Sequence, residues 1–222
     1  MKTIFENVSG MVPVIRVNNR ELNLTFYKEA LGFKVISEEN ALAILGGKTA
    51  KTIDDAVLII EESPSMRTRA VNGVKKLRKI VLESPEFTEG FEKISPEGDV
   101  FEVVPSASKD GELKIRDIEL ATANLAESLA FYTEGFGLKQ EENRVFLPFG
   151  TISYTQAQGP DLMSKPEEVW DIEIIEFKVS KAVDLKQIAA QLDDLSLTYY
   201  VDPKAKVLTL SDAQNTEIWF AK

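Results

Sequence analysis

The chain has 222 residues, 44% of them hydrophobic and 28% charged, and its formal net charge at pH 7 is −10. This composition suits a globular protein of one or two domains, and the excess of carboxylates argues against a nucleic-acid partner, because phosphate binding needs clustered Lys and Arg side chains. Cysteine and histidine are both absent from the sequence, which excludes disulfides, thiolate nucleophiles and zinc-thiolate sites, and also removes the commonest general base and transition-metal ligand.

The N-terminal stretch has one Lys, and Glu6, Asn7, Ser9 and Gly10 interrupt its apolar residues. It therefore does not have the pattern of a signal peptide. No run of apolar residues approaches the length of a membrane span. The expectation is a cytoplasmic protein without a membrane partner.

In chain order, a β-branched strand is predicted over 11–17, followed by a helix that Asn18 or Asn19 caps and that ends at Gly32. Three strands at 33–37, 41–45 and 56–61 complete a βαβββ unit. A crossover at 63–74 leads to a shorter unit, predicted as a strand at 77–83, a helical stretch at 86–93 and a strand at 100–104. The small and polar residues of 105–112 form the best linker candidate.

The second half repeats this order twice in full. Its first unit is predicted as a strand at 113–120, a helix at 124–135 and strands at 138–140, 145–149 and 152–156. After a crossover at 157–171, its second unit is predicted as a strand at 172–179, a helix at 184–195 and strands at 197–201, 207–210 and 217–220.

An internal repeat underlies this pattern, since NRELNLTFYKEALGF, from Asn19, returns as NLAESLAFYTEGFGL, from Asn124. In each copy an Asn leads a helix that carries a Phe-Tyr pair and ends at a Gly turn. The aromatic pairs, Phe26 with Tyr27 and Phe131 with Tyr132, are predicted to pack in the core with the tyrosine hydroxyls near its rim.

FYKEALGF and FYTEGFGL, together with SPEGDVFEV at 95–103, resemble motifs of the vicinal-oxygen-chelate or glyoxalase/bleomycin-resistance superfamily. More narrowly, the order of the units, the acidic balance and the lack of cysteine and histidine resemble the streptococcal CppA family, which is named as a proteinase degrading the third complement component. The resemblance implies an α+β fold of two glyoxalase-like domains, in which paired βαβββ modules form curled, half-open sheets. The first domain, 1–107, would have a compressed second module, and the second, 108–222, two full modules.

In this superfamily the usual activity depends on a divalent metal that His and Glu side chains hold on equivalent strands. By the resemblance, the ligand positions fall on Val12 or Pro13, Glu102, Asp117, Glu173 or Ile174, and Trp219. The first half then keeps at most one ligand. Metal-dependent chemistry is accordingly expected to be lost, and no cofactor is expected.

An alternative is that Asp117, Glu119, Glu173 and Glu217 form an all-oxygen site in the second half, which would suit Mg²⁺ or Ca²⁺. The competing interpretation is that they are exposed carboxylates alternating with core residues in an acidic protein.

Proteolysis is a further alternative function, because the family name implies it. The composition excludes cysteine proteases, the Ser-His-Asp triad and HExxH metalloproteases. A serine activated by lysine remains, and Ser106 with Lys109 forms such a string, although it lies in the predicted linker without a frame that would desolvate the lysine.

For a ligand or partner, the candidate residues are Glu102 and the basic residues Arg67, Arg69 and Lys75, which belong to the one basic cluster in the sequence. That cluster could receive an anion or an acidic surface, or could be a solvated crossover loop. Three hypotheses therefore remain: a metal-free module that binds a small ligand or a protein partner, the proteinase, and a divalent-metal lyase or dioxygenase. Either a monomer or a homodimer is compatible with the four modules, and a location at the cell surface or outside it follows only if the family resemblance holds.

Overall fold

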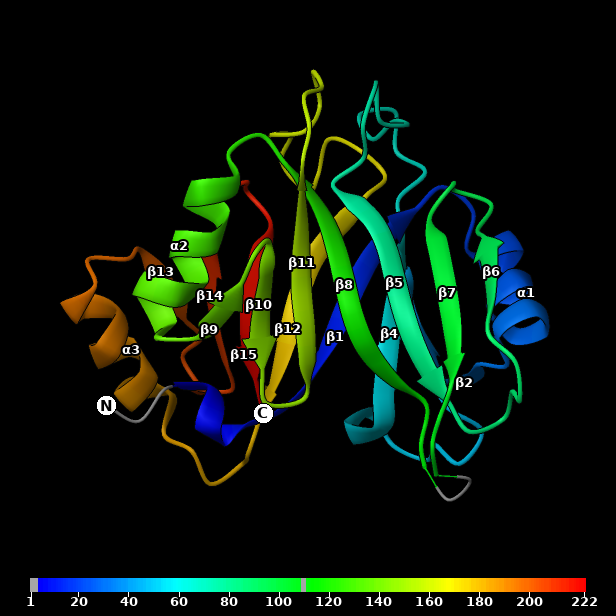
Figure 1. Cartoon of the computed structure of the whole chain (residues 1–222), viewed down its shortest axis with the longest axis horizontal. Coiled ribbons are helices and arrows are strands. Elements are labelled where there is room, and N and C mark those ends of the chain that lie inside the picture. Colours follow the sequence, from blue (N-terminus) through cyan, green and yellow to red (C-terminus); the bar gives the residue numbers. More distant parts are fainter. Residues whose placement is uncertain (1–3, 109–110) are drawn as a thin grey trace.

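The computed structural model describes residues 4–108 and 111–222. Within these ranges the chain forms two open β-sheets, three α-helices and two short 3-10 helices, η1 (Ile4–Asn7) and η2 (Ile53–Asp55). Figure 1 shows the seven-stranded sheet in front of the eight-stranded sheet, with the helices at the two sides. The α+β fold with curled, half-open sheets that the sequence predicts is therefore confirmed.

The eight-stranded sheet combines the first and the fourth module. Its strands, in spatial order, are β13 (Tyr199–Val201), β14 (Val207–Ser211), β15 (Glu217–Ala221), β12 (Ile172–Val179), β1 (Val8–Val17), β4 (Ala56–Glu62), β3 (Leu42–Gly46) and β2 (Lys34–Glu39). The two modules join where β1 and β12 pair in antiparallel fashion.

The seven-stranded sheet combines the second and the third module. Its strands, in spatial order, are β6 (Phe91–Ile94), β7 (Val100–Pro105), β5 (Leu77–Ser84), β8 (Lys114–Thr122), β11 (Gly150–Gln156), β10 (Arg144–Leu147) and β9 (Lys139–Glu141). The modules join at the antiparallel pair of β5 and β8. Each sheet therefore takes one module from each half of the sequence, and both sheets cross the boundary between residues 107 and 108.

The helices are α1 (Arg20–Leu31), α2 (Leu125–Phe136) and α3 (Leu185–Asp194). Asn19 and Asn124 cap the first two, and their side-chain oxygens accept first-turn N–H bonds at 2.9 and 3.3 Å. Both helices end at a glycine in the left-handed region, Gly32 (φ 74°) and Gly137 (φ 67°), a conformation that glycine adopts without a steric penalty. No α-helix in the described part of the chain has the length and apolar character needed to cross a membrane.

Helices α1 and α2 each contact strands of their own sheet and also pack an aromatic ring against the other sheet. The ring of Tyr27 in α1 stands edge-on to Phe101 of the seven-stranded sheet, with centroids 5.3 Å apart. The ring of Phe136 in α2 lies 6.1 Å from Phe220 of the eight-stranded sheet. The two inner faces and the helices share one hydrophobic core. The prediction that the tyrosine hydroxyls reach its rim is wrong, because those of Tyr27 and Tyr132 are buried.

The helical stretch predicted over 86–93 is also wrong. The segment forms a turn and then the edge strand β6, in which Phe91 pairs with Val103 of β7. The ring of Phe87 packs edge-on against that of Phe91, at 4.8 Å between centroids. A Cβ atom at Gly90 would lie 3.2 Å from the Val103 carbonyl oxygen, so glycine suits this close approach of the backbone to β7. Cross-strand pairing therefore outweighs the local helical preference.

Candidate functional site

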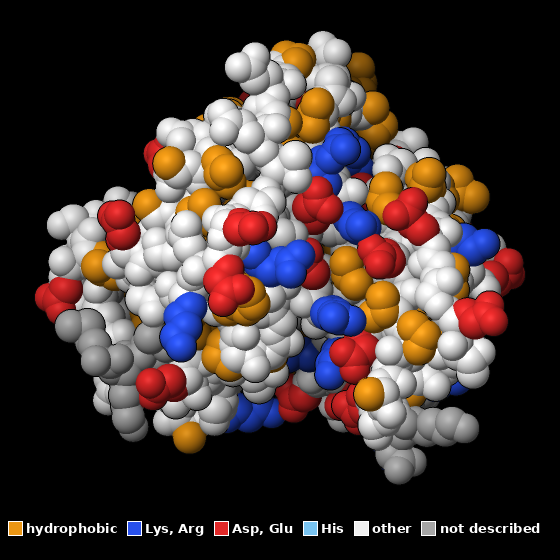
Figure 2. All heavy atoms as spheres, in the orientation of Figure 1, with side chains coloured by type: hydrophobic (Ala, Val, Ile, Leu, Met, Phe, Trp, Pro, Cys, Tyr) orange, Lys and Arg blue, Asp and Glu red, His pale blue; other side chains and the backbone are white. Residues whose placement is uncertain are grey.

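The outer face of the seven-stranded sheet bears a polar cleft of about 410 Å³, called the front cleft here. Side chains from β5, β7, β8, β10 and β11 line it, because residues that alternate with the core residues along these strands point outward. Figure 2 shows Lys and Arg side chains mixed with Asp and Glu side chains over the middle of this face. The front cleft contains Glu102, Asp117 and Glu119 of the residues singled out in the sequence.

Groups of the protein itself bind two of these carboxylates. The Lys79 ammonium donates to Glu102 Oε2 at 2.8 Å, and this hydrogen bond raises the pKa of Lys79. Asp117 accepts hydrogen bonds from the hydroxyl of Thr151 and, at 2.6 Å, from that of Ser153. The two carboxylates thus have a cation or hydroxyl donors as partners.

The third carboxylate has a partner of the same kind, since Thr155 donates its hydroxyl to Glu119 at 2.8 Å. Arg116 and Arg144 also line the front cleft. Neither guanidinium has a hydrogen bond or an ion pair with any residue that the structure describes. The charged side chains of this cleft that have no partner among the described residues are therefore two cations, although the chain as a whole is acidic.

The four carboxylates of the predicted all-oxygen site do not come together. Asp117 and Glu119 lie on β8 in the seven-stranded sheet, whereas Glu173 and Glu217 lie on β12 and β15 in the other sheet. No group of three or more Asp and Glu side chains that could hold a metal ion is found among residues 4–108 and 111–222.

Glu173 belongs to a charge cluster on the outer face of the eight-stranded sheet. Its Oε1 lies 2.5 Å from Arg16 Nη2, and Glu61 shares the same guanidinium at 3.6 Å. Burial raises the pKa of Glu173 to about 7; Arg16 opposes this shift and the negative charge of Glu61 adds to it. The remaining candidate, Glu217, accepts a hydrogen bond from the indole of Trp219 at 2.7 Å.

These contacts do not fit the divalent metal that the superfamily implies. Two of the carboxylates at the matching positions, Glu102 and Glu173, are held by the cations Lys79 and Arg16. A metal ion would have to displace those side chains and would gain few oxygen ligands in return.

The basic residues proposed for ligand or partner binding do not form one patch. Arg69 makes a bidentate ion pair with Asp161, at 2.5 and 2.7 Å, which joins the two crossover segments and lowers the pKa of Asp161 to about 2. Lys75 forms an ion pair with Asp99. Arg67 is exposed, and none of the three basic residues lines the front cleft.

The serine of the S-x-x-K string has a carboxylate as its partner. Ser106 donates its hydroxyl to Glu83 Oε1 at 3.0 Å, and the Lys114 ammonium lies 3.2 Å from the same oxygen. Lys109 lies outside the described residues.

The arginines of the front cleft are not among the residues singled out from the sequence. Arg144 could have been found by alternation, because Val145 and Leu147 point inward on β10. Arg116 could not, because the register between β5 and β8 shifts beside it and so breaks the alternation that would otherwise turn it toward the core.

The fold places the chain among proteins of the glyoxalase type. It superposes on glyoxalase I from Zea mays with a TM-score of 0.65 and 11% identity, over 98% of this chain and 94% of that chain. A putative dioxygenase from Bacillus subtilis gives a TM-score of 0.66 and 12% identity, over 97% and 85%. At these identities the similarity concerns the fold alone.

The sequence narrows this class to one family. Residues 10–90 match the model of the CppA N-terminal region, and residues 111–220 match that of the CppA C-terminal region. The chain belongs to the CppA family. The cppA protein of Streptococcus pneumoniae TIGR4 is 26% identical, with a TM-score of 0.72 over 97% of this chain and 98% of that one. No curated protein matches the sequence.

Proposed function

We propose that the chain is a metal-free binding protein and that its front cleft receives a small anionic ligand with a carboxylate or phosphate group. The observation that carries this proposal is the presence of Arg116 and Arg144, without protein partners in the described residues, in a cleft whose carboxylates are already bonded. Guanidinium groups bind carboxylates and phosphates in bidentate geometry, which favours these anions over halides.

The rest of the front cleft supports recognition of a polar ligand. Thr151 and Ser153 supply hydroxyls, and Asn143 and Thr155 add further polar groups. The volume of about 410 Å³ admits a small molecule and not a folded domain. An acidic side chain of a partner protein presents the same carboxylate and is the second possible source of the ligand.

Titration with succinate and with inorganic phosphate tests the site, with ionic strength held constant by NaCl. Ligand that binds only the folded state must raise the melting temperature in a concentration-dependent way. We expect this rise for the native chain and its loss in the double variant Arg116→Gln, Arg144→Gln. The matched control is Arg67→Gln with Arg78→Gln, which removes the same charge from exposed positions outside the front cleft. If neither anion shifts the melting temperature, or if the cleft variant responds like the control, the proposal fails.

The metal-free part of the proposal has its own test. Purified protein is expected to carry no stoichiometric divalent metal, and Mg²⁺, Ca²⁺ and Mn²⁺ are expected to leave its melting temperature unchanged. A retained metal, lost on Asp117→Ala, would favour the lyase or dioxygenase hypothesis. No contact among the described residues favours the proteinase hypothesis, because the Ser106 hydroxyl is bonded to Glu83.

A further inference from the structure

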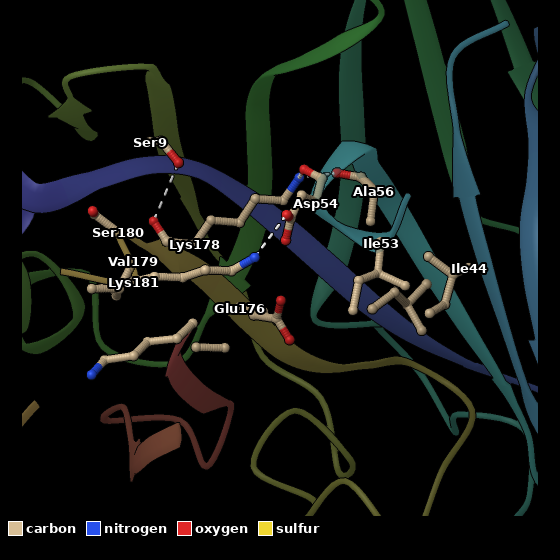
Figure 3. A pocket seen from close by; sticks show the side chains of 13 residues that line it. Ser9, Ile44, Ile53, Asp54, Ala56, Glu176, Lys178, Val179, Ser180 and Lys181 are labelled. Atoms are coloured by element: carbon tan, nitrogen blue, oxygen red, sulfur yellow. Dashed lines mark hydrogen bonds and ion pairs between the residues drawn. The ribbon is translucent and has the colours of Figure 1, made fainter. Parts of the chain in front are cut away.

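A second cleft, of about 510 Å³, lies on the outer face of the eight-stranded sheet, where the first and fourth modules meet. This rear cleft is shown in Figure 3. Its walls come from β1, β3, β4, β12 and β15, from η2 and from the turn after β12. It shares no lining residue with the front cleft.

Branched aliphatic side chains form one wall of the rear cleft. Ile44 of β3 and Ile59 of β4 are cross-strand neighbours, and Ile53 of η2 adds a side chain that is 63% exposed. Figure 3 shows Ile44 and Ile53 at one side of the cleft, away from the labelled lysines. Apolar surface of this kind favours a ligand with an aliphatic body.

The lysines nearest to the cavity are already bonded. Lys178 donates to the backbone carbonyl oxygens of Asp54 at 2.8 Å and Ala56 at 2.5 Å, and burial lowers its pKa. Lys181 pairs with the Asp54 carboxylate at 3.1 Å. A further lysine, Lys222, also lines the cleft.

Glu176 is the acidic side chain of the lining that remains, since Asp54 is paired with Lys181. Its carboxylate points into the cavity in Figure 3, and no hydrogen bond or ion pair joins it to any other residue in the described part of the chain. Burial raises the pKa of Glu176, and the charge of Lys178 opposes this shift only in part. A half-buried carboxylate without a partner gains most from a ligand that brings a cationic hydrogen-bond donor.

We propose that the rear cleft binds an aliphatic primary amine, with its ammonium on Glu176 and its branched chain against the isoleucine wall. This site is separate from the front cleft and selects the opposite charge. Free amines and amino acids carry this chemistry, as does the N-terminal residue of a peptide that begins with Leu, Ile or Val.

Calorimetric titration with 3-methylbutylamine tests the proposal at a pH of about 8, where the ammonium of the ligand is charged. Two comparison ligands separate the contributions: 3-methylbutan-1-ol keeps the branched chain without the charge, and methylamine keeps the charge without the chain. We expect saturable binding of 3-methylbutylamine and at least about tenfold weaker binding of either comparison ligand. The alcohol loses a hydrogen bond between charged groups, and methylamine loses the burial of the branched chain. Equal binding of the amine and the alcohol would overturn the proposal.

The variant Glu176→Gln keeps the shape of the side chain and removes an uncompensated charge, so it is expected to fold. It should bind 3-methylbutylamine at least about tenfold more weakly, whereas Glu39→Gln, an exposed site on β2 of the same sheet, should bind like the native chain. Ile53→Ser should weaken binding several-fold. Unchanged binding of 3-methylbutylamine by the Glu176→Gln variant would contradict the proposal.

Two further titrations identify the source of the amine and test whether the two sites are independent. Leucyl-glycine bound more tightly than 3-methylbutylamine would support a peptide N-terminus, and similar affinities would support a free amine. Amine binding should persist in the Arg116→Gln, Arg144→Gln variant, and its loss there would contradict two separate sites.

Discussion

The two outer sheet faces have the same modular plan and opposite character. On the front face the paired side chains of Lys79 and Glu102 are 28% and 36% exposed, and the neighbouring carboxylates are bonded to hydroxyls. On the rear face the paired side chains of Arg16 and Glu173 are each only 11% exposed. The comparison teaches that the same kind of ion pair has a different energetic weight on each face, because water screens the first and is excluded from the second.

The largest expected effect comes from breaking the pair on the rear face. Arg16→Ala leaves Glu173 and Glu61 close together and partly buried without their cation. Removing one partner of a buried pair typically costs about 3 kcal/mol or more of the free energy of unfolding. Urea denaturation measures the loss, and Arg78→Ala, at an exposed position, is the control. A loss below about 1 kcal/mol would show that the rear face is as well hydrated as the front.

An intermediate effect is expected from pH. The carboxyl of Glu173 has a pKa of about 7 in the folded chain against a usual value of 4.5, so the folded state holds this proton more strongly than the unfolded state does. The contribution of this group to stability is therefore fully present below pH 4.5, and it is lost as the pH rises to about 7. Because the shift is shared with Arg16 and Glu61, we expect a change of about 1 to 3 kcal/mol.

Glu173→Gln should remove that pH dependence, since glutamine does not titrate. The comparison is between unfolding free energies of the native chain and of the variant across the range from pH 4.5 to pH 8 or so, with Glu39→Gln as the control. Parallel curves for the native chain and Glu173→Gln would contradict the assignment.

The smallest expected effect is on the front face. Lys79→Ala removes a half-exposed partner of Glu102, and such pairs contribute less than about 1 kcal/mol to stability. The same denaturation experiment applies, and added salt should make the loss smaller still, because ions screen an exposed pair. A loss as large as that of Arg16→Ala would remove the contrast between the two faces.

Local patterns predicted most elements of the fold. Capping residues such as Asn19 and Gly32 marked the ends of a helix, and a run rich in β-branched and aromatic residues predicted β12 with its observed bounds. β6 was missed because its strand character depends on pairing with β7, a contact that the local sequence does not contain. The pairing of the modules across the two halves depends on distant partners in the same way.

The candidate sites were less predictable than the fold. Glu102 and Asp117 do line one cleft, but Arg116 lies at a register shift that breaks the alternation, and Glu176 reads as one more carboxylate in an acidic chain. Whether a charged side chain is bonded or left without a partner depends on residues from other strands. Sequence spacing therefore indicates which face a residue occupies and not whether it is available for a ligand.

The order in which the modules pair also affects how the chain can be made. All strands of the seven-stranded sheet have been synthesised once the chain reaches Gln156. By contrast, β1 is made first but has no neighbouring strand from the second half until β12 is complete at Val179. The first module pairs with the fourth and the second with the third, so neither half of the chain alone contains a complete sheet. Such distant pairings carry a large loop-closure entropy and slow folding. During synthesis, the first strand to leave the ribosome can pair with β4 early but gains its second neighbour only after most of the chain has been made.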